Sequence, residues 1–315
     1  RSVKLAPEVN LADIARGTPG FSGAELAALV NEAAIIAAMK EHAYVRQEDL
    51  EEARDKVRFG RAKKSRVMEE EDKRITAYHE AGHALVNLLL DHTEPLHKVT
   101  IIPRGMALGV TMFLPEKDRL HYTRNQALDS LAVSYGGRVA EEVFCDDITS
   151  GATSDIQHAT GLARAMVTRW GMSDALGPIN LAERSGSDFL GNEISMGRDH
   201  SPATAKRIDE EVERMLREAQ DRAESIIRGN VEAMHRITEA LLEYETISGE
   251  EVRRLYEGTP PSELRPRGNG PSEAGSPPPL PPTAPETTGP APVTPPPAPP
   301  APPLPPRPHP GGGTT

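Results

Sequence analysis

Two histidines and a glutamate stand at the spacing of a metal site within residues 76–85. His79, Glu80 and His83 form the pattern H-E-x-x-H in a stretch that favours helix. Histidines four positions apart lie on one face of a helix, so both imidazoles can reach a single zinc ion. Glu80 follows His79 round the helix, where its carboxylate can act as a general base toward a water molecule. The pattern therefore predicts a zinc-dependent hydrolytic site.

The alternative is a solvated helix face that carries these side chains by chance. The apolar run over residues 84–90 argues against it, because a helix with this run is buried on at least one face. Histidines and a carboxylate that face a core need a compensating partner. We therefore expect a metal site at these residues.

A zinc site of this kind needs a third protein ligand from elsewhere in the chain. The candidates downstream of the motif are Glu141, Glu142, Asp146, Asp147, Asp155 and His158. Asp155 stands at the start of a predicted helix, where its charge would also complement the helix dipole. Glu141 and Glu142 can equally be solvated helix residues. Spacing alone leaves the third ligand open.

Several segments together carry a family resemblance. They are residues 78–84, 98–105, 108–111, 136–142, 149–152, 163–173 and 241–246. These segments resemble the peptidase domain of the FtsH family, which comprises membrane-anchored, ATP-dependent zinc metalloproteases. The resemblance covers roughly residues 1–258. It implies that His79, His83 and Asp155 bind zinc, that Glu80 is the catalytic base, and that Glu141 orients a ligand from outside the metal's own shell.

Residues 1–60 are predicted to form an all-helical domain. Ser22 and Glu25 have the spacing of a capping box, and the helix that they begin carries an apolar stripe at helical spacing. A further helix is expected over residues 47–57.

The segment 18–26 resembles the AAA+ ATPase lid of the same family. In that lid the positions of Gly23 and Ala24 close over the adenosine of a bound nucleotide. The alternative for these residues is a helix start that is packed for stability.

A basic linker is expected over residues 61–69, followed by a peptidase domain over residues 70–258. The sequence predicts helices at about 70–92, 123–144, 154–170, 202–230, 231–244 and 249–257, with β segments at 99–102 and 108–113. The fold class is thus mainly α: a helical lid, then a helix-rich zincin domain with a small sheet. A free edge of that sheet could pair with an extended peptide.

Composition sets limits on the remaining functions. The net charge is −11 without a basic stripe, which argues against nucleic acid as a partner. The single cysteine, Cys145, excludes an internal disulfide and is expected to be a small apolar residue near a helix end. Most of the 30 prolines lie in residues 259–315, so we expect a disordered, proline-rich tail. Residues 302–307 fit a P-x-x-P-x-R docking pattern, although a spacer is the simpler interpretation.

The sequence contains no G-x-x-x-x-G-K-[ST] phosphate loop and no run of 18 apolar residues. We therefore expect a fragment of a longer protein. The resemblance implies ATP with Mg²⁺, a membrane anchor and a homo-hexamer for that parent, with this region on the cytoplasmic or organelle-interior side and soluble by itself.

The predicted function is zinc-dependent endopeptidase activity on unfolded or membrane proteins. The alternatives are a non-catalytic AAA+-associated scaffold or assembly module, and a proline-rich interaction protein.

Overall fold

The computed structural model describes residues 3–61, 68–105, 107–114, 121–182 and 200–265. The proline-rich residues 266–315, with the pattern at 302–307, and most of the expected linker lie outside these ranges. Among the described residues, no helix is both long enough and apolar enough to cross a membrane.

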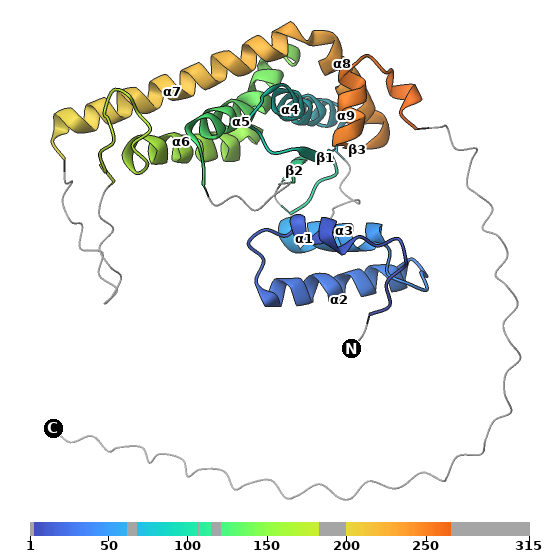
Figure 1. Cartoon of the computed structure of the whole chain (residues 1–315). Coiled ribbons are helices and arrows are strands. Elements are labelled where there is room, and N and C mark those ends of the chain that lie inside the picture. Colours follow the sequence, from blue (N-terminus) through green and yellow to red (C-terminus); the bar gives the residue numbers. More distant parts are fainter. Residues whose placement is uncertain (1–2, 62–67, 106, 115–120, 183–199, 266–315) are drawn as a thin grey trace, which may run out of the picture. The chain divides into compact units, whose positions relative to one another are not determined.

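The first helices form a small domain with a core of its own. They are α1 (Leu11–Arg16), α2 (Gly23–Met39) and α3 (Gln47–Phe59) (Figure 1). The expected capping box is present, because the Ser22 hydroxyl accepts from the Glu25 amide and the Glu25 carboxylate accepts from the Ser22 amide. The buried apolar residues that form this core are Ile14, Leu29, Ala33, Ala37, Val45, Leu50 and Ala53.

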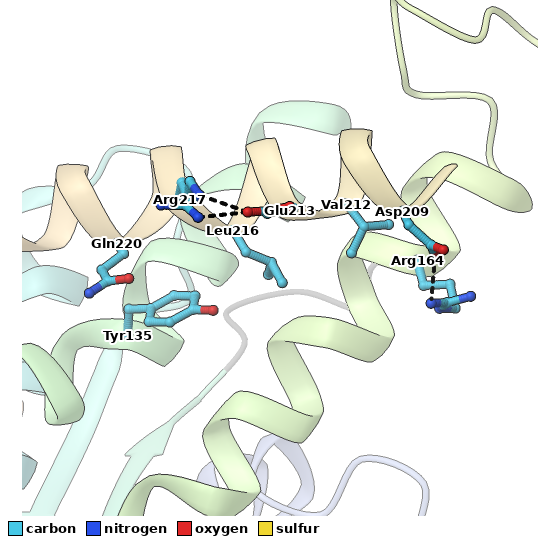
Figure 2. A pocket seen from close by; sticks show the side chains of 8 residues that line it. All are labelled: Tyr135, Arg164, Asp209, Val212, Glu213, Leu216, Arg217 and Gln220. Carbon is cyan, nitrogen blue, oxygen red and sulfur yellow. Dashed lines mark hydrogen bonds and ion pairs between the residues drawn. The ribbon is translucent and has the colours of Figure 1, made fainter. Parts of the chain in front are cut away.

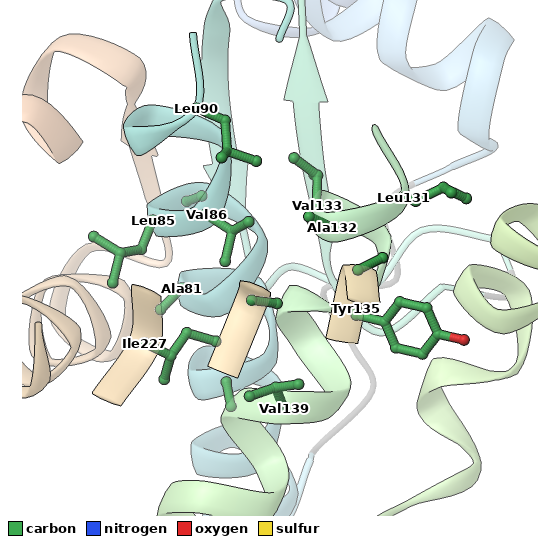
Figure 3. Close-up of a cluster of buried hydrophobic side chains, with 14 of the residues drawn as sticks. Ala81, Leu85, Val86, Leu90, Leu131, Ala132, Val133, Tyr135, Val139 and Ile227 are labelled. Carbon is green, nitrogen blue, oxygen red and sulfur yellow. The ribbon is translucent and has the colours of Figure 1, made fainter. Parts of the chain in front are cut away.

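The larger part of the chain packs around a second core. Its helices are α4 (Glu70–Leu89), α5 (Arg124–Phe144), α6 (Thr153–Thr168), α7 (Pro202–Gly229), α8 (Val231–Tyr244) and α9 (Gly249–Tyr256). Helix α4 packs against α5 and α8, and the long helix α7 runs along α5 and α6 (Figure 1). Figure 3 shows the centre of this core, where apolar side chains of α4 and α5 meet Ile227 of α7.

Helices α4 and α5 approach so closely because glycines face one another where they meet. A Cβ atom on Gly82 would lie 2.2 Å from the carbonyl oxygen of Gly136, and a Cβ on Gly136 would lie 2.7 Å from that of Gly82. Such a distance leaves no room for a side chain on either helix. The close approach brings the histidine face of α4 against the following turn of α5.

The sheet is small and antiparallel, with the strand order β2-β1-β3. Strand β2 (Val110–Phe113) lies within the expected segment 108–113. Strand β1 (Leu96–Thr100) overlaps the expected segment 99–102 at residues 99 and 100 only, because the strand begins and ends earlier than predicted. The third strand, β3 (Thr246–Ser248), was not expected from the sequence and pairs with β1 at the side opposite β2. Of the strands that the structure describes, β2 is therefore at one edge of the sheet.

The packed chain continues past residue 259, where the tail was expected to begin. A short 3₁₀ turn spans Pro261–Glu263, and Leu264 is buried in the main core. Arg265 forms an ion pair with Glu251 at 2.7 Å. The sequence becomes rich in proline at residue 259, but contacts with the core continue to Arg265. A boundary drawn from proline content alone is therefore too early.

Candidate metal centre

Helix α4 brings the two motif histidines together, as the sequence predicts. His79 and His83 are 9% and 7% exposed, and their Nε2 atoms lie 3.1 Å apart. The first turn of this helix carries Glu70, Glu71 and Asp72. Their negative charges interact favourably with the positive end of the helix dipole and so stabilise the helix.

Helix α6 supplies the third side chain of the cluster. One carboxylate oxygen of Asp155, Oδ2, lies 3.3 Å from Nε2 of His79 and 3.5 Å from Nε2 of His83. Asp155 is in the first turn of α6, which follows the 3₁₀ turn Ser150–Ala152. Of the candidates that the sequence left open, Asp155 alone joins the two histidines in a potential ligand group of the described residues; Glu142, Asp146, Asp147 and His158 do not.

The three atoms have the spacing of ligands around a tetrahedral zinc ion. Ligand atoms about 2.0–2.1 Å from such an ion stand about 3.3–3.4 Å from one another. The observed sides of the triangle are 3.1, 3.3 and 3.5 Å. Two imidazole nitrogens and a carboxylate oxygen are also a donor set that zinc prefers. The residues therefore fit the metal that the motif implies.

Two partners on α5 hold the outer nitrogens of the imidazoles. Nδ1 of His79 lies 2.7 Å from Oε1 of Glu141, and Nδ1 of His83 lies 2.7 Å from the Val133 carbonyl oxygen. Since Nδ1 donates in each ring, the lone pair of each neutral ring is on Nε2, toward the centre of the triangle. The second Glu141 oxygen accepts from the Thr149 amide at 2.7 Å, which ties α5 to the turn before α6.

The carboxylates of Glu141 and Asp155 contact His79 and stabilise a positive charge at this position. Burial acts to lower its pKa, but hydrogen bonds to Asp155 and Glu141 outweigh burial and raise the pKa to about 10. Burial acts to raise the pKa of both carboxyls, but their hydrogen bonds to the histidines lower it in each case. In the metal-free protein a proton on His79 supplies the positive charge that a metal ion would supply when bound.

Glu80 lies beside the triangle and is 5% exposed. Its carboxylate oxygen Oε2 accepts from the Thr111 hydroxyl of β2 at 2.5 Å. Burial raises the pKa of this carboxyl, and the Thr111 hydrogen bond and the neighbouring histidines partly offset that effect. A buried carboxyl with a raised pKa is suited to accepting and then returning a proton near neutral pH.

Two glycines shape this centre, and sequence reasoning did not identify them as site residues. A Cβ atom on Gly137 would lie 2.5 Å from Nε2 of His79 and 2.6 Å from Nε2 of His83. A Cβ on Gly109 would lie 2.6 Å from Oε1 of Glu80. The pair Gly136-Gly137 inside a helical pattern was a signal of close packing, since glycine weakens a helix interior.

Gly23 and Ala24 are exposed in the first turn of α2. Cys145 is half-buried and ends α5, and burial raises the pKa of its thiol.

His42, Glu48 and Asp49 form a second potential ligand group. Its buried carboxylate is already engaged, because Asp49 accepts from Lys40, His42 and the Arg46 amide. The Lys40 ammonium, 2.9 Å from Asp49, already supplies a positive charge to this carboxylate.

A separate hollow of about 440 Å³ lies between α5, α6 and α7 (Figure 2). Its charged side chains are paired with one another, Arg164 with Asp209 and Arg217 with Glu213. The residues that line it also include Tyr135, Val212, Leu216 and Gln220. This lining does not offer a metal-ligand set.

The sequence matches two family profiles. That of peptidase family M41 matches residues 66–255, and that of the AAA+ lid domain matches residues 8–52.

Curated relatives are similar over most of the chain. ATP-dependent zinc metalloprotease FtsH 2 of Methylacidiphilum infernorum is 52% identical over 255 residues, which is 81% of this chain and 40% of that protein. ATP-dependent zinc metalloprotease FtsH of Caulobacter vibrioides is 48% identical over 83% of this chain and 42% of its own length. The protein of that name from Neorickettsia risticii is 50% identical over 82% and 40%. The chain thus spans about two fifths of the length of these relatives.

Proposed function

The chain belongs to peptidase family M41, and on that premise we propose that it is a zinc-dependent endopeptidase with Glu80 as its general base. His79 and His83 would hold the metal through Nε2, and Asp155 through its carboxylate. The observation that carries the proposal is the triangle of these three atoms, with sides of 3.1, 3.3 and 3.5 Å. A buried carboxylate beside the triangle completes the set.

His79, His83 and Asp155 would hold zinc at this triangle, where the ion would act as a Lewis acid toward the scissile carbonyl. The protein's own residues do the rest of the chemistry. Glu80 removes a proton from the attacking water and returns it to the nitrogen of the departing amine. Glu141 and the Val133 carbonyl keep both imidazoles in the orientation that metal binding requires, because they accept from the outer nitrogens.

The edge strand β2 is the proposed binding surface for the substrate. Among the described residues it pairs with β1 at one side only, and its Thr111 contacts the base. An extended, unfolded peptide could add to this edge through main-chain hydrogen bonds. Recognition of that kind tolerates many side chains, which suits an enzyme that degrades unfolded or membrane proteins.

We also propose two domains for this chain and, by family resemblance, an ATP-coupled assembly for the longer protein. Residues 1–60 are an AAA+ lid in which Gly23 and Ala24 approach a bound nucleotide, and residues 70–258 are the core of the peptidase domain. The relatives are named ATP-dependent proteases, which supports coupling to ATP, and by family resemblance Mg²⁺ would accompany the nucleotide. By family resemblance, the parent protein is a membrane-anchored homo-hexamer with this region on the cytoplasmic or organelle-interior side.

Substitutions of the motif separate the metal ligands from the base. His83→Ala should abolish zinc retention and cleavage, because it removes a ligand. Glu80→Gln should retain about one zinc per chain and lose turnover by about 10²- to 10⁴-fold, the range expected for a lost general base. Glu70→Gln, an exposed residue of the same helix, should change neither.

The measurements are zinc content by elemental analysis and cleavage of an unfolded protein such as casein. Wild-type protein that binds zinc but cleaves nothing would favour the scaffold alternative. Cleavage by Glu80→Gln at the wild-type rate would reject the role of the base.

A further inference from the structure

The Glu80 carboxylate is held from the sheet rather than from its own helix. Among the described residues, the Thr111 hydroxyl is the sole side-chain hydrogen-bond donor to this carboxylate, and it contacts Oε2 at 2.5 Å. The same hydroxyl lies 3.3 Å from the main-chain carbonyl oxygen of Glu80. A distance of 2.5–2.7 Å is typical of a hydroxyl that donates to an ionised carboxylate.

The other carboxylate oxygen is constrained by space. A Cβ atom at Gly109 would lie 2.6 Å from Oε1 and 2.7 Å from Cγ of Glu80. Gly109 therefore leaves the room in which Oε1 lies, while Thr111 fixes Oε2. Since both residues are at the start of β2 or just before it, one short segment determines the orientation of the whole carboxylate.

We propose that Thr111 is a positioning residue for the catalytic base, which leaves Oε1 as the oxygen that exchanges the proton with water. This inference rests on the proposed function, since it concerns the same base. It also joins the proposed peptide-binding edge to the chemistry, because Thr111 belongs to the edge strand β2. A general base acts only when its oxygen lies within hydrogen-bond reach of the proton that it abstracts.

The competing interpretation is that Thr111 only stabilises the fold by satisfying a buried carboxylate. Three substitutions distinguish the two. Thr111→Val removes the hydroxyl with little change of shape, and Thr111→Ser keeps it. Thr246→Val is a matched control, because Thr246 is a half-buried threonine on the opposite edge strand whose hydroxyl bonds to Thr100 at 2.7 Å.

Steady-state kinetics on an unfolded peptide form the first arm of the test. Thr111→Val should lower kcat by about 10- to 100-fold, part of the full contribution of a general base, with KM and zinc content unchanged. Thr111→Ser should recover kcat to within about threefold of wild type. Thr246→Val should lower the melting temperature but not kcat. Gly109→Ala should also lower kcat while retaining zinc, because its Cβ would displace Oε1 of Glu80.

The second arm uses metal-free protein and needs no activity. In a double-mutant cycle of urea midpoints, Thr111→Val should shift the midpoint in the wild-type background and shift it much less in the Glu80→Ala background. Thr246→Val should shift it equally in both backgrounds.

Each outcome decides one of the two claims. Unchanged kcat in Thr111→Val, a rise in KM alone, or additive midpoints in the cycle would overturn this inference while wild-type cleavage upheld the proposed function. Wild-type protein without zinc-dependent cleavage would reject the proposed function and this inference with it, even where the cycle showed the contact.

Discussion

At the scale of single residues, two carboxylates and a histidine balance their charges in the buried metal centre. Asp155 and Glu141 flank His79, and hydrogen bonds to them raise the pKa of that imidazole to about 10. A proton or a metal ion must therefore supply positive charge between these carboxylates. The proposed metal set is stable for the same reason that the metal-free set holds its proton, because the carboxylates are already in place.

Glu141 offers the clearest test of a residue that acts on the metal from outside its ligand shell. Glu141→Gln removes the charge that orients His79, so zinc affinity should fall by about 10- to 100-fold. The control is Glu142→Gln, since Glu142 is the adjacent residue and is exposed. Competition with a chromogenic chelator measures both affinities. Equal affinities for the two variants would show that Glu141 does not tune the site, whereas total loss of zinc would indicate that it is itself a ligand.

At the scale of elements, the close approach of α4 and α5 controls the geometry of the site. Gly82 and Gly136 let the two backbones meet, and the next residue along α5, Gly137, then faces both histidines. The outer partners of the histidines, Glu141 and the Val133 carbonyl, also come from α5. A shift between these two helices would therefore disturb the ligand triangle and its supports together.

Two glycine-to-alanine substitutions test the close approach of the helices. Gly82→Ala should lower the free energy of unfolding by about 1–3 kcal/mol or more, because its Cβ would overlap the Gly136 backbone. Gly161→Ala is the matched control, since Gly161 is inside α6 and its Cβ would meet nothing within 4 Å. That change should raise stability by about 0.4–1 kcal/mol. Urea unfolding followed by circular dichroism measures both, and a tolerated Gly82→Ala would mean that the two helices can separate without cost.

At the scale of the whole molecule, the described chain has two separate apolar cores, one in α1–α3 and one in the larger part. The second core extends to the last described residues. Leu264 is buried in it, and Arg265 pairs with Glu251 and donates to the Thr246 carbonyl at 2.8 Å. The last contacts with the core are therefore made by residues that already lie in the proline-rich part of the sequence.

Two truncated chains test where the residues needed for stability and activity end. A chain that ends at residue 268 should keep the melting temperature, zinc content and activity of the full chain. A chain that ends at residue 258 should melt several degrees lower, because it loses the burial of Leu264 and the ion pair of Arg265. Differential scanning calorimetry of the three chains measures the effect. Loss of zinc in the longer truncated chain would show that residues 269–315 support the site.

The sequence by itself determined the features that depend on local periodicity. His79 and His83 are four residues apart, so a helix must place them on one face. The capping box at Ser22 begins a helix where it was predicted, because the paired side chains satisfy amides of the same turn. A capping box of the same kind at Thr123 begins the helix that was expected from residue 123. The class of the fold and most of its helices followed from such short-range patterns.

Only the tertiary structure decided which distant residues join the motif. Asp155 reaches the histidines, and Thr111 reaches Glu80, through the packing of α6 and β2 against α4, which no spacing in the sequence encodes. Strand β3 was missed because three residues are too few for a periodic signal. Local order depends on neighbours along the chain, whereas the completed site depends on how closely separate helices can approach.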